Sequence, residues 1–590
     1  MDTMESQLPV PLGATTIDKA KQAAIRDILR VRPIYTLQGP PGTGKTTLVS
    51  HLVRQILADD PVAQLLITAQ AHGAVDVLRQ KVRDEAFAGV AVDDQPLAVR
   101  LRPVRDGAIL EEGSVESVSS EILRRARERL LNERAPTPVQ IEWLGVVQEM
   151  LGALEAGTAR QEAPDFCEVV KRGANLTYCT TSAGDLEALA RSAQSFDWSI
   201  LEEAGKAHGF DLALPLQAGH RWLLIGDQRQ LAPHRIEDFQ KGLANLQRVA
   251  DDLWSLGSRK GTAALVDRDW VRSWRDRPEA SRIDFLKFCQ DWLKTFERIF
   301  KSCESARDGR QVTIEESIGA AAGMLSRQHR MHPSIGTLIS DAYYDGQIVN
   351  ETIANGVLNP KVVHPFTQPA GIAGRAIVWL DLPWAKKDAR SSEVGPEQNQ
   401  PRYTNPAEIA AITWFMSFLK AGVGSASADG IPLKLAVLSP YSQQVRMINR
   451  QQALIPMPPG IVRKENLATA RRAGGTVETR LAHTVDSFQG NQADIVIVSL
   501  VRNSSMLPLS QARGFLDDPA RINVLLSRAE RLLVLVGSWD FFQYQFAHVR
   551  LEERRDPLWH WSRVLQSLTD AFGSGTALQI PVPETVFRSL

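Results

Sequence analysis

Residues 39–46 read Gly-Pro-Pro-Gly-Thr-Gly-Lys-Thr, and these residue types at this spacing are typical of a phosphate-binding loop. Glycines let the backbone curve around a chain of phosphates, so that backbone amides face the negative charge. In this pattern Lys45 reaches the β- and γ-phosphates, and the Thr46 hydroxyl binds Mg²⁺. The pattern therefore predicts a site for a nucleoside triphosphate, and its structural alternative is a merely glycine-rich turn.

The segments on both sides of the loop favour phosphate binding over a simple turn. The apolar run 34–37 is typical of a buried strand, and apolar residues recur at helical spacing from about Thr46 onward. The helical positions are Leu48, Val49, Leu52, Val53, Ile56 and Leu57. A strand, the loop and a helix in this order form the context in which the motif binds phosphate.

Two adjacent carboxylates, Glu202 and Glu203, follow the apolar run 198–201, which is typical of a buried strand. In P-loop NTPases an acidic residue at such a strand end holds Mg²⁺, directly or through water. A neighbouring carboxylate orients and deprotonates the attacking water. The position of this pair after a phosphate-binding loop favours catalysis over a chance Glu-Glu sequence.

Polar side chains also follow the other strands that we predict in the first half, at 65–69, 176–181 and 222–225. In open parallel sheets, ligands bind at the carboxyl ends of the strands. Gln230 is placed to hydrogen-bond a γ-phosphate or the attacking water, and its alternative is a polar turn. His72 is expected to be a satisfied loop histidine.

A helix that opens at Asp18 carries Gln22 just upstream of the loop. A glutamine amide can pair with both the acceptor and the donor on an adenine edge. The alternative is a solvated helix glutamine, and spacing alone favours neither.

The second half predicts another parallel α/β sheet, because strand-like runs alternate with helical ones. The predicted strands are 376–380, 435–439, 494–500 and 532–536, and the helices between them include 408–419 and 443–451. This half has no phosphate-binding loop, so we do not expect it to be an independent NTPase. One sheet with the loop and one without suggest a nucleotide clamped between them, with arginines of the second sheet neutralising charge on the γ-phosphate.

Two stretches of the first half, at about 82–164 and 234–323, read as helical insertions. Residues 119–131 and 139–154 predict a charged helical hairpin, whose arginines are better explained by a solvated face than by phosphate contacts. The second stretch is rich in aromatic residues, which either form a core of its own or stack bases; helical spacing favours the core. These residues are Trp254, Trp270, Trp274, Trp292, Phe285, Phe288, Phe296 and Phe300.

Length and composition fit a chain of two or more globular domains. The chain has 590 residues, and Lys+Arg and Asp+Glu both number 68, which argues against a strongly basic nucleic-acid coat but not against a local basic groove. The four cysteines lack metal-ligand spacing, and no apolar run approaches the 18 residues of a membrane span. The amino-terminal residues do not read as a signal peptide. We therefore expect a cytoplasmic protein with reduced thiols and no membrane segment.

Taken in order, these motifs resemble those of the superfamily 1 helicases, specifically the Upf1-like group (SF1B, AAA_11/AAA_12-type). The resemblance covers most of residues 15–545. The matching segments are 39–46 (motif I), 68–76 (Ia), 178–181 (Ic), 200–207 (II), 225–233 (III), 328–333 (a Q-[YH]-R-M-H-P segment), 438–444 (IV), 485–502 (V) and 521–537 (VI).

The resemblance implies an ATP-driven helicase that tracks along single-stranded DNA or RNA, in this group usually from 5′ to 3′. The catalytic residues that it implies are Lys45, Glu203, Gln230 and two arginine fingers, Arg330 and Arg528. The nucleotide-binding residues that it implies are Gln22, Gly39, Pro40, Gly42, Thr43, Gly44, Lys45, Thr46, Thr47, Tyr441 and Gly490, with Gln22 and Tyr441 at the adenine. The implied Mg²⁺ ligands are Thr46 and Glu202, and the implied contacts to the nucleic-acid backbone are Thr68, Thr181, Thr484 and Arg502.

Three features depart from the family pattern. Glu202 replaces the usual motif II aspartate and is one methylene longer, and Gln492 replaces the acid of motif V. Only 38 residues precede Gly39, so we expect no β-barrel of the Upf1 kind ahead of the loop. These departures leave an alternative open, an ATP-gated clamp on nucleic acid or protein with little or no unwinding. A small-molecule kinase is disfavoured, because the second sheet supplies arginines and no recognisable acceptor pocket.

The sequence thus predicts an α/β protein of two RecA-like parallel-sheet domains. Domain 1 spans residues 15–325 and carries the P-loop and both helical insertions, and domain 2 spans 326–545. Residues 546–590 form a tail for which the sequence indicates no role. The expected cofactors are ATP and Mg²⁺, and the expected partners are single-stranded nucleic acid and, through the insertions, other proteins.

Overall fold

The computed structural model divides into two compact units, which are described one at a time. The first comprises residues 1–38, 45–228 and 232–324, and the second comprises 39–44, 229–231 and 325–590. The described residues are 17–101, 112–155, 164–181, 184, 186–187, 195–233, 236–258, 266–308, 321–354, 356–384, 403–422, 431–464, 480–488, 490–503, 514–546 and 559–587.

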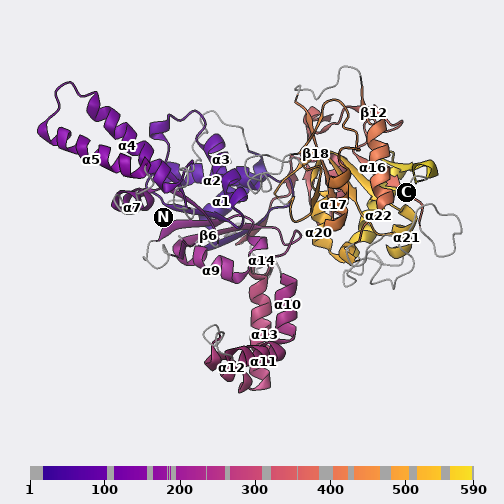
Figure 1. Cartoon of the computed structure of the whole chain (residues 1–590), viewed down its shortest axis with the longest axis horizontal. Helices are drawn as coiled ribbons and strands as arrows, with labels where there is room; N and C mark the ends of the chain where they lie inside the picture. The colour runs from indigo at the N-terminus through magenta and orange to yellow at the C-terminus, as the bar shows by residue number, and fades with distance from the viewer. Residues whose placement is uncertain are drawn as a thin grey trace. The chain divides into compact units, whose positions relative to one another are not determined.

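The first unit is built on a seven-stranded sheet, to which the strand β6 labelled in Figure 1 belongs. The order is β3-β4-β2-β5-β6-β1-β7, and every neighbouring pair is parallel. Its central strands are buried over most of their length, as expected for a parallel sheet with helices on its faces. The strands are β1 (Ile34–Gln38), β2 (Leu65–Ala69), β3 (Ala98–Arg100), β4 (Leu176–Thr180), β5 (Phe196–Leu201), β6 (Gly219–Gly226) and β7 (Ala322–Met324). The accompanying helices are α1 (Lys19–Arg30), α2 (Lys45–Asp59), α3 (His72–Ala86), α7 (Pro164–Gly173), α9 (Gly209–Ala218) and α14 (Thr295–Asp308).

The second unit contains another seven-stranded sheet, in which all described pairings are again parallel. The order is β16-β15-β18-β19-β13-β20, and β17 pairs with β15. The strands are β13 (Ile377–Asp381), β15 (Leu433–Ser439), β16 (Ile461–Arg463), β17 (Ala482–Thr484), β18 (Ala493–Ser499), β19 (Ala529–Gly537) and β20 (Ala577–Pro581). The helices are α15 (Pro333–Tyr343), α16 (Pro406–Phe418), α17 (Ser442–Gln451), α20 (Pro519–Leu526), α21 (Trp539–Phe546) and α22 (Trp559–Gly573). Two parallel α/β sheets confirm the predicted fold class.

Short elements complete the description. The remaining strands form two-stranded pairs, which are β8 (Arg327–Gln328) with β9 (Val349–Asn350), β10 (Ile353–Ala354) with β11 (Val357–Leu358), and β12 (Phe366–Gln368) with β14 (Lys420–Ala421). The 3₁₀ turns are η1 (Val92–Asp94), η2 (Ala204–Lys206), η4 (Pro360–Val362), η5 (Gly514–Asp517) and η6 (Glu584–Phe587). Among the described residues, no helix combines the length and apolar character that crossing a bilayer requires.

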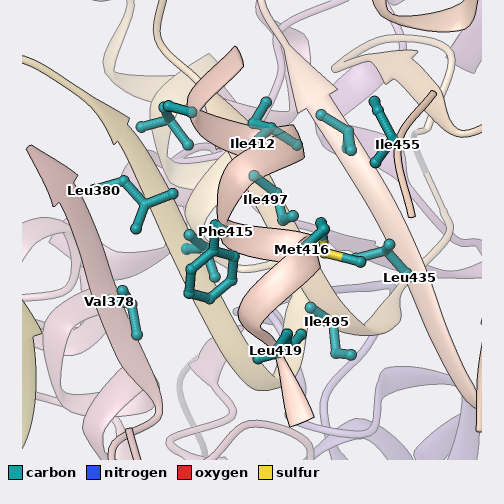
Figure 2. Packing of buried hydrophobic residues seen from close by; sticks show 14 of the residues in the cluster. Val378, Leu380, Ile412, Phe415, Met416, Leu419, Leu435, Ile455, Ile495 and Ile497 are labelled. Carbon is teal, nitrogen blue, oxygen red and sulfur yellow. The ribbon is translucent and has the colours of Figure 1, made fainter. Parts of the chain in front are cut away.

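Helix α16 shows how the core of the second unit forms. The Asn405 side chain accepts a hydrogen bond from the Glu408 amide, and Pro406 occupies the first turn, so the helix has a well-defined start. From there Phe415 and Met416 pack into the cluster that Figure 2 shows, against apolar side chains of β13, β15 and β18. The sheet residues of this cluster include Val378, Leu380, Leu435, Ile495 and Ile497.

The carboxyl-terminal segment belongs to the second unit, although the sequence indicated no role for residues 546–590. Strand β20 pairs in parallel with β13, from Ile377 opposite Ala577 to Asp381 opposite Pro581. Trp561 of α22 is fully buried, and its indole nitrogen donates to the Leu516 carbonyl at 2.8 Å. The segment therefore completes one edge of the second sheet.

The stretch 82–164 is helical only in part, which corrects the prediction of a purely helical insertion. Strand β3 lies within it and forms an edge of the first sheet. Helices α4 (Val115–Leu131) and α5 (Pro138–Glu155) then form the predicted hairpin (Figure 1), whose core joins Leu123 to Val147 and Leu151.

The stretch 234–323 contains α10 (Ile236–Ala244), α11 (Leu246–Gly257), α12 (Arg268–Arg275) and α13 (Glu279–Leu293). The prediction that this stretch has a core of its own is confirmed. Trp254, Trp270, Trp274 and Phe285 pack there around Ala250 and Val271. Phe296 and Phe300 instead pack against Leu201 and Leu224 in the core of the sheet. Phe288 is 59% exposed, so neither core includes it.

Helix α5 offers a stability prediction. Gly145 lies in its interior, and a Cβ added there would meet no heavy atom within 4 Å. Gly145→Ala should therefore stabilise the hairpin by about 0.5–1 kcal/mol, because alanine is the better helix former and nothing has to move. Hydrogen exchange of the α5 amides measures this change, and faster exchange in the variant would contradict it.

Candidate nucleotide-binding site

The loop between β1 and α2 has the backbone that wraps phosphate. Gly42 and Gly44 have φ angles of +75° and +76°, a region that only glycine adopts without strain. The Thr43 hydroxyl donates to the Pro40 carbonyl at 2.8 Å, which closes the turn ahead of α2. Helix α2 then begins at Lys45 with its amino-terminal amides directed toward the loop.

Helix α2, which follows the loop, meets the carboxyl end of β5 in the first unit. The Thr46 hydroxyl donates to Glu202 Oε1 at 2.9 Å, and the Glu202 amide donates to the Thr68 carbonyl at 2.8 Å. Burial raises the pKa of Glu202, and the neighbouring Glu203 adds to this, while the Thr46 hydrogen bond and Lys45 oppose it. A hydroxyl and a buried carboxylate this close supply the hard oxygen ligands that Mg²⁺ prefers, so these residues fit the ion.

Glu203 adopts the left-handed conformation, with φ 59° and ψ 27°. Lys206, which the sequence did not single out, holds its side chain, since Nζ lies 2.6 Å from Glu203 Oε1. Gly205 allows this turn to lie against the end of β6, because a Cβ there would approach the Asp227 amide nitrogen to 3.1 Å. The carboxylate next to Glu202 is thus fixed by backbone and by an ion pair.

Asp227 marks the end of the next strand. Gln38, the last residue of β1, donates from Nε2 to Asp227 Oδ1 at 3.2 Å, so the ends of two adjacent strands are bridged. Gln230 follows in the turn and is partly buried. Residues 229–231 belong to the second unit, where Asn523 of α20 donates to the Arg229 carbonyl at 2.8 Å.

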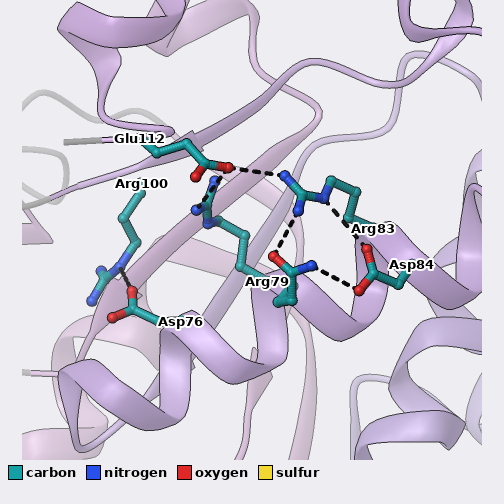
Figure 3. Close-up of polar contacts among 7 residues, drawn as sticks. Asp76, Arg79, Arg83, Asp84, Arg100 and Glu112 are labelled. Atoms are coloured by element: carbon teal, nitrogen blue, oxygen red, sulfur yellow. Dashed lines mark hydrogen bonds and ion pairs between the residues drawn. The ribbon is translucent and has the colours of Figure 1, made fainter. Parts of the chain in front are cut away.

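His72 is a satisfied histidine, as predicted. Its Nδ1 lies 3.1 Å from Nη2 of Arg100, a buried arginine that also contacts Asp76 Oδ1 at 3.4 Å. Figure 3 shows Arg100 with Asp76, and beside them Arg79 and Arg83, which lie close to Glu112. Nothing in the sequence pattern linked Arg100 to Asp76 and His72 of α3, from which 24 and 28 residues separate it.

In the second unit, the side chain of Gln328 organises the turn that carries Arg330. Gln328 Oε1 accepts from the amides of Arg330 and Met331 at 2.9 and 2.8 Å, and its Nε2 donates to Asn350 Oδ1 at 2.7 Å. Loop residues 39–44 belong to this unit too, and a Cβ added at Gly42 would lie 2.8 Å from the Arg330 Cβ. Burial lowers the pKa of Arg330, while Glu530 opposes this shift.

Arg528 lies between α20 and β19, 7% exposed, and its Nη1 donates to the Asn491 carbonyl at 3.3 Å. Gln492, the residue that departs from the family pattern, lines a cavity of about 270 Å³ with Asp494 and Glu530. Burial raises the pKa of Glu530, and Arg330 opposes that rise. The same cavity is also lined by Lys434, Lys464 and Arg531, so charged side chains of both signs surround Gln492. Glu530 was not found from the sequence.

Tyr441 lies in an aromatic cluster rather than on an open surface. It is 4% exposed, with T-shaped contacts to Tyr403 and Phe515 at ring-centroid distances of 5.7 and 5.4 Å. The guanidinium of Arg502 lies 3.8 Å from the Tyr403 ring centroid and is fully buried. Gln22 is exposed on α1, where its amide donates to the Ile17 carbonyl at 2.9 Å.

The remaining predicted contacts to nucleic acid differ in access. The hydroxyls of Thr68 and Thr181 are buried and make no hydrogen bond among the described residues. Thr484 is partly exposed, and its hydroxyl accepts from the Ser487 amide at 3.2 Å. Of the residues predicted to bind the nucleotide, Gly490 is exposed and has a φ angle of +77°. The Thr47 hydroxyl donates to Glu85 Oε1 at 3.5 Å.

The start of α15 predicts a pH dependence. His332 caps this helix by accepting from the Ser334 amide, and burial lowers its pKa from 6.5 to about 4. Because the unfolded chain binds this proton more readily, His332 should cost stability as the pH falls from 6.5 toward 4, by at most about 3 kcal/mol. His332→Asn keeps a capping acceptor that does not titrate, so the stability of the variant relative to the wild type should rise over this range. Chemical denaturation at pH 7 and pH 5 measures it, and a pH-independent difference would refute it.

Comparison with known proteins adds to this geometry. Two AAA domain families match the chain, AAA_11 over residues 16–162 and 108–237 and AAA_12 over 307–540. A regulator of nonsense transcripts 1 homolog of Neurospora crassa is 23% identical over 91% of this chain and 38% of its own length. The ATP-dependent helicase upf1 of Schizosaccharomyces pombe is 23% identical over 91% of this chain and 46% of its own length.

Among solved structures, the DNA-bound helicase MrfA superposes with a TM-score of 0.38 at 9% identity, over 88% of this chain and 49% of that one. The chain spans between a third and a half of the length of the curated relatives that it matches. The two family matches cover the P-loop, the acidic strand end and both arginine segments in order. The chain therefore belongs to the superfamily 1 helicases, in the Upf1-like group.

Proposed function

We propose that this chain is an ATP-driven translocase and helicase on single-stranded nucleic acid. In this proposal the P-loop, Glu203 and the two arginines Arg330 and Arg528 act on one triphosphate. ATP binding and hydrolysis would then change how tightly each unit binds the nucleic-acid strand. The proposed direction, from 5′ to 3′, is taken from the Upf1-like group.

The observation that carries the proposal is the hydrogen bond from Thr46 to Glu202. It joins the first turn of the P-loop helix to the end of β5, at a distance of 2.9 Å. Glu203, held in a fixed orientation, is the next residue. The first turn of α2 and two adjacent carboxylates thus lie together at one edge of the first sheet. This supports the proposal, because NTP hydrolysis needs phosphate-binding, metal-binding and water-activating groups close to one another.

Each group then has a role. Lys45 and the loop amides would bind the β- and γ-phosphates, and Glu203 would orient and deprotonate the attacking water. Gln230 would sense the γ-phosphate, and Arg330 and Arg528 would neutralise charge on it during transfer. Thr46 and Glu202 would hold Mg²⁺, whose contribution when bound is to neutralise charge on the phosphate oxygens.

In this proposal the protein would hold the nucleic-acid strand through contacts to its sugar-phosphate backbone. Thr484 is accessible for such a contact, whereas Thr68, Thr181 and Arg502 are buried in this structure. We propose that these three reach the strand only after a conformational change on ATP binding. Gln22 and Tyr441 are proposed to contact the adenine, which requires the aromatic cluster at Tyr441 to open.

The test is ATP hydrolysis with and without single-stranded oligonucleotides, at a stated salt concentration because phosphate contacts are salt-sensitive. We expect matched DNA and RNA strands to stimulate hydrolysis severalfold or more, and Lys45→Ala to abolish it. The preferred polymer is the one that stimulates more. An ATPase that responds to neither polymer would overturn the proposal.

Glu202 favours a second candidate, an ATP-gated clamp. Its carboxylate contacts Thr46 directly, and its longer side chain occupies the position of the family's aspartate, which argues for slow turnover. A clamp would bind a strand tightly with ATP but neither displace a duplex nor move along it. A strand-displacement assay separates the two functions.

A further inference from the structure

Helix α5 of the first unit carries an apolar stripe on a face that α4 does not cover. Val139, Trp143 and Val146 recur at helical spacing i, i+4 and i+7 and are 60%, 58% and 37% exposed. The adjoining flank of α5 is covered, because Val147, one turn after Trp143, packs with Leu151 on Leu123 of α4. The apolar arc of α5 therefore extends beyond the flank that α4 covers, which indicates a further surface to be buried.

The charged side chains of this helix are all acidic. Residues Pro138–Glu155 include Glu142, Glu149 and Glu155 and contain no lysine or arginine. Glu155 is paired with Arg124 of α4 at 2.9 Å. Within the part of the chain that the structure describes, Glu142 and Glu149 form no ion pair, and both project beside the stripe, one turn or less from it.

We propose that this surface of α5, the stripe Val139, Trp143 and Val146 edged by Glu142 and Glu149, docks a basic amphipathic helix of a partner protein. The apolar face of such a helix would cover the stripe, with Trp143 as its main anchor, since tryptophan is enriched at interface hot spots. Its lysines or arginines would meet the two glutamates, which gives the contact its orientation.

The same charges argue against two other occupants. A nucleic-acid strand would meet unpaired carboxylates and no cation on α5, so the phosphates would be repelled. A second copy of this chain, packed α5 on α5, would bring like-charged glutamates together. The proposal does not depend on the proposed helicase function, because none of the nucleotide-site residues lies on α5.

The test uses the full chain and a synthetic helical peptide of about 16 residues, long enough to be partly helical alone, with leucines at helical spacing and lysines on the other positions. Fluorescence anisotropy of the labelled peptide should show saturable binding. Trp143→Ala should weaken that binding about tenfold or more. The double variant Glu142→Lys, Glu149→Lys should weaken it at low salt and less at high salt.

Two controls keep the result interpretable. Gln148→Ala, an exposed position on the side of α5 away from the stripe, should leave binding unchanged, and a peptide with glutamate in place of lysine should not bind. All variants should keep the wild-type circular dichroism spectrum and basal ATPase rate.

Four results would overturn the proposal. They are absence of saturable binding, binding unaffected by Trp143→Ala, equal binding of the acidic peptide, and a self-associated chain that Trp143→Ala converts to monomers.

Discussion

Glu203→Gln should reduce kcat for ATP hydrolysis by about 10² to 10⁴-fold, the range expected for loss of a general base. The glutamine amide keeps the size of the side chain but does not accept the proton of the attacking water. ATP binding should survive, because Lys45 and the loop glycines are unchanged. Single-turnover hydrolysis measures the chemical step, and binding of a fluorescent ATP analogue measures the retained affinity.

Glu121→Gln is the matched control, since it makes the same exchange at an exposed carboxylate of α4 that pairs with Arg125. Its kcat should stay within about twofold of the wild type, in line with surface substitutions away from special features. Glu203→Gln with near-normal kcat, beside an inactive Glu202→Gln, would move the role of base to Glu202.

Arg528→Ala should lower kcat by about 10³ to 10⁵-fold, which is the contribution of an arginine finger to phosphoryl transfer. Arg330→Ala should lie in the same range, and the double variant should be little worse than either single one, because both arginines would act on one transferring group. Arg528→Lys should recover only part of the rate, since an ammonium lacks the planar fork of the guanidinium.

Arg563→Ala is the control within the same unit. This arginine pairs with Asp345 at 2.8 Å and lies over the Trp559 ring, so its loss should lower stability slightly and leave kcat unchanged. If Arg528→Ala changed the melting temperature but not kcat, Arg528 would be a structural residue of the second unit and not a finger.

The parts of the fold that could be predicted are those with strong local signals. The apolar runs that end in polar residues correspond to the central strands of both sheets, since strands buried on both faces read as continuous apolar runs. Glu202 and Glu203 were found because they follow such a run after a P-loop. Their meeting with Thr46 is then a consequence of parallel strands ending at one edge.

Other parts have no local signal. Strand β3 has three residues and β20 contains Gln579 and ends at Pro581, so neither shows a periodicity that the sequence alone distinguishes from a loop. Lys206 contacts Glu203 only because the turn between them brings the two side chains together. Glu530 interacts with Arg330, which is far from it in the sequence, so no local pattern indicates this pair. The aromatic helices were predicted as a core, but which rings face outward depends on packing, as the exposed Phe288 and buried Trp274 show.

The pairing of the edge strands sets the order in which a newly synthesised chain can finish each unit. Strand β1 needs β7 as its outer neighbour, and β13 needs β20, although each partner emerges from the ribosome far later. Until then an unpaired strand edge is available to other chains, a common origin of misassembly. The first sheet can close once residue 324 has been translated, whereas the second sheet waits for residues 577–581. The edge of β13 therefore stays open until the last stage of synthesis, and a chaperone that shields it would matter until then.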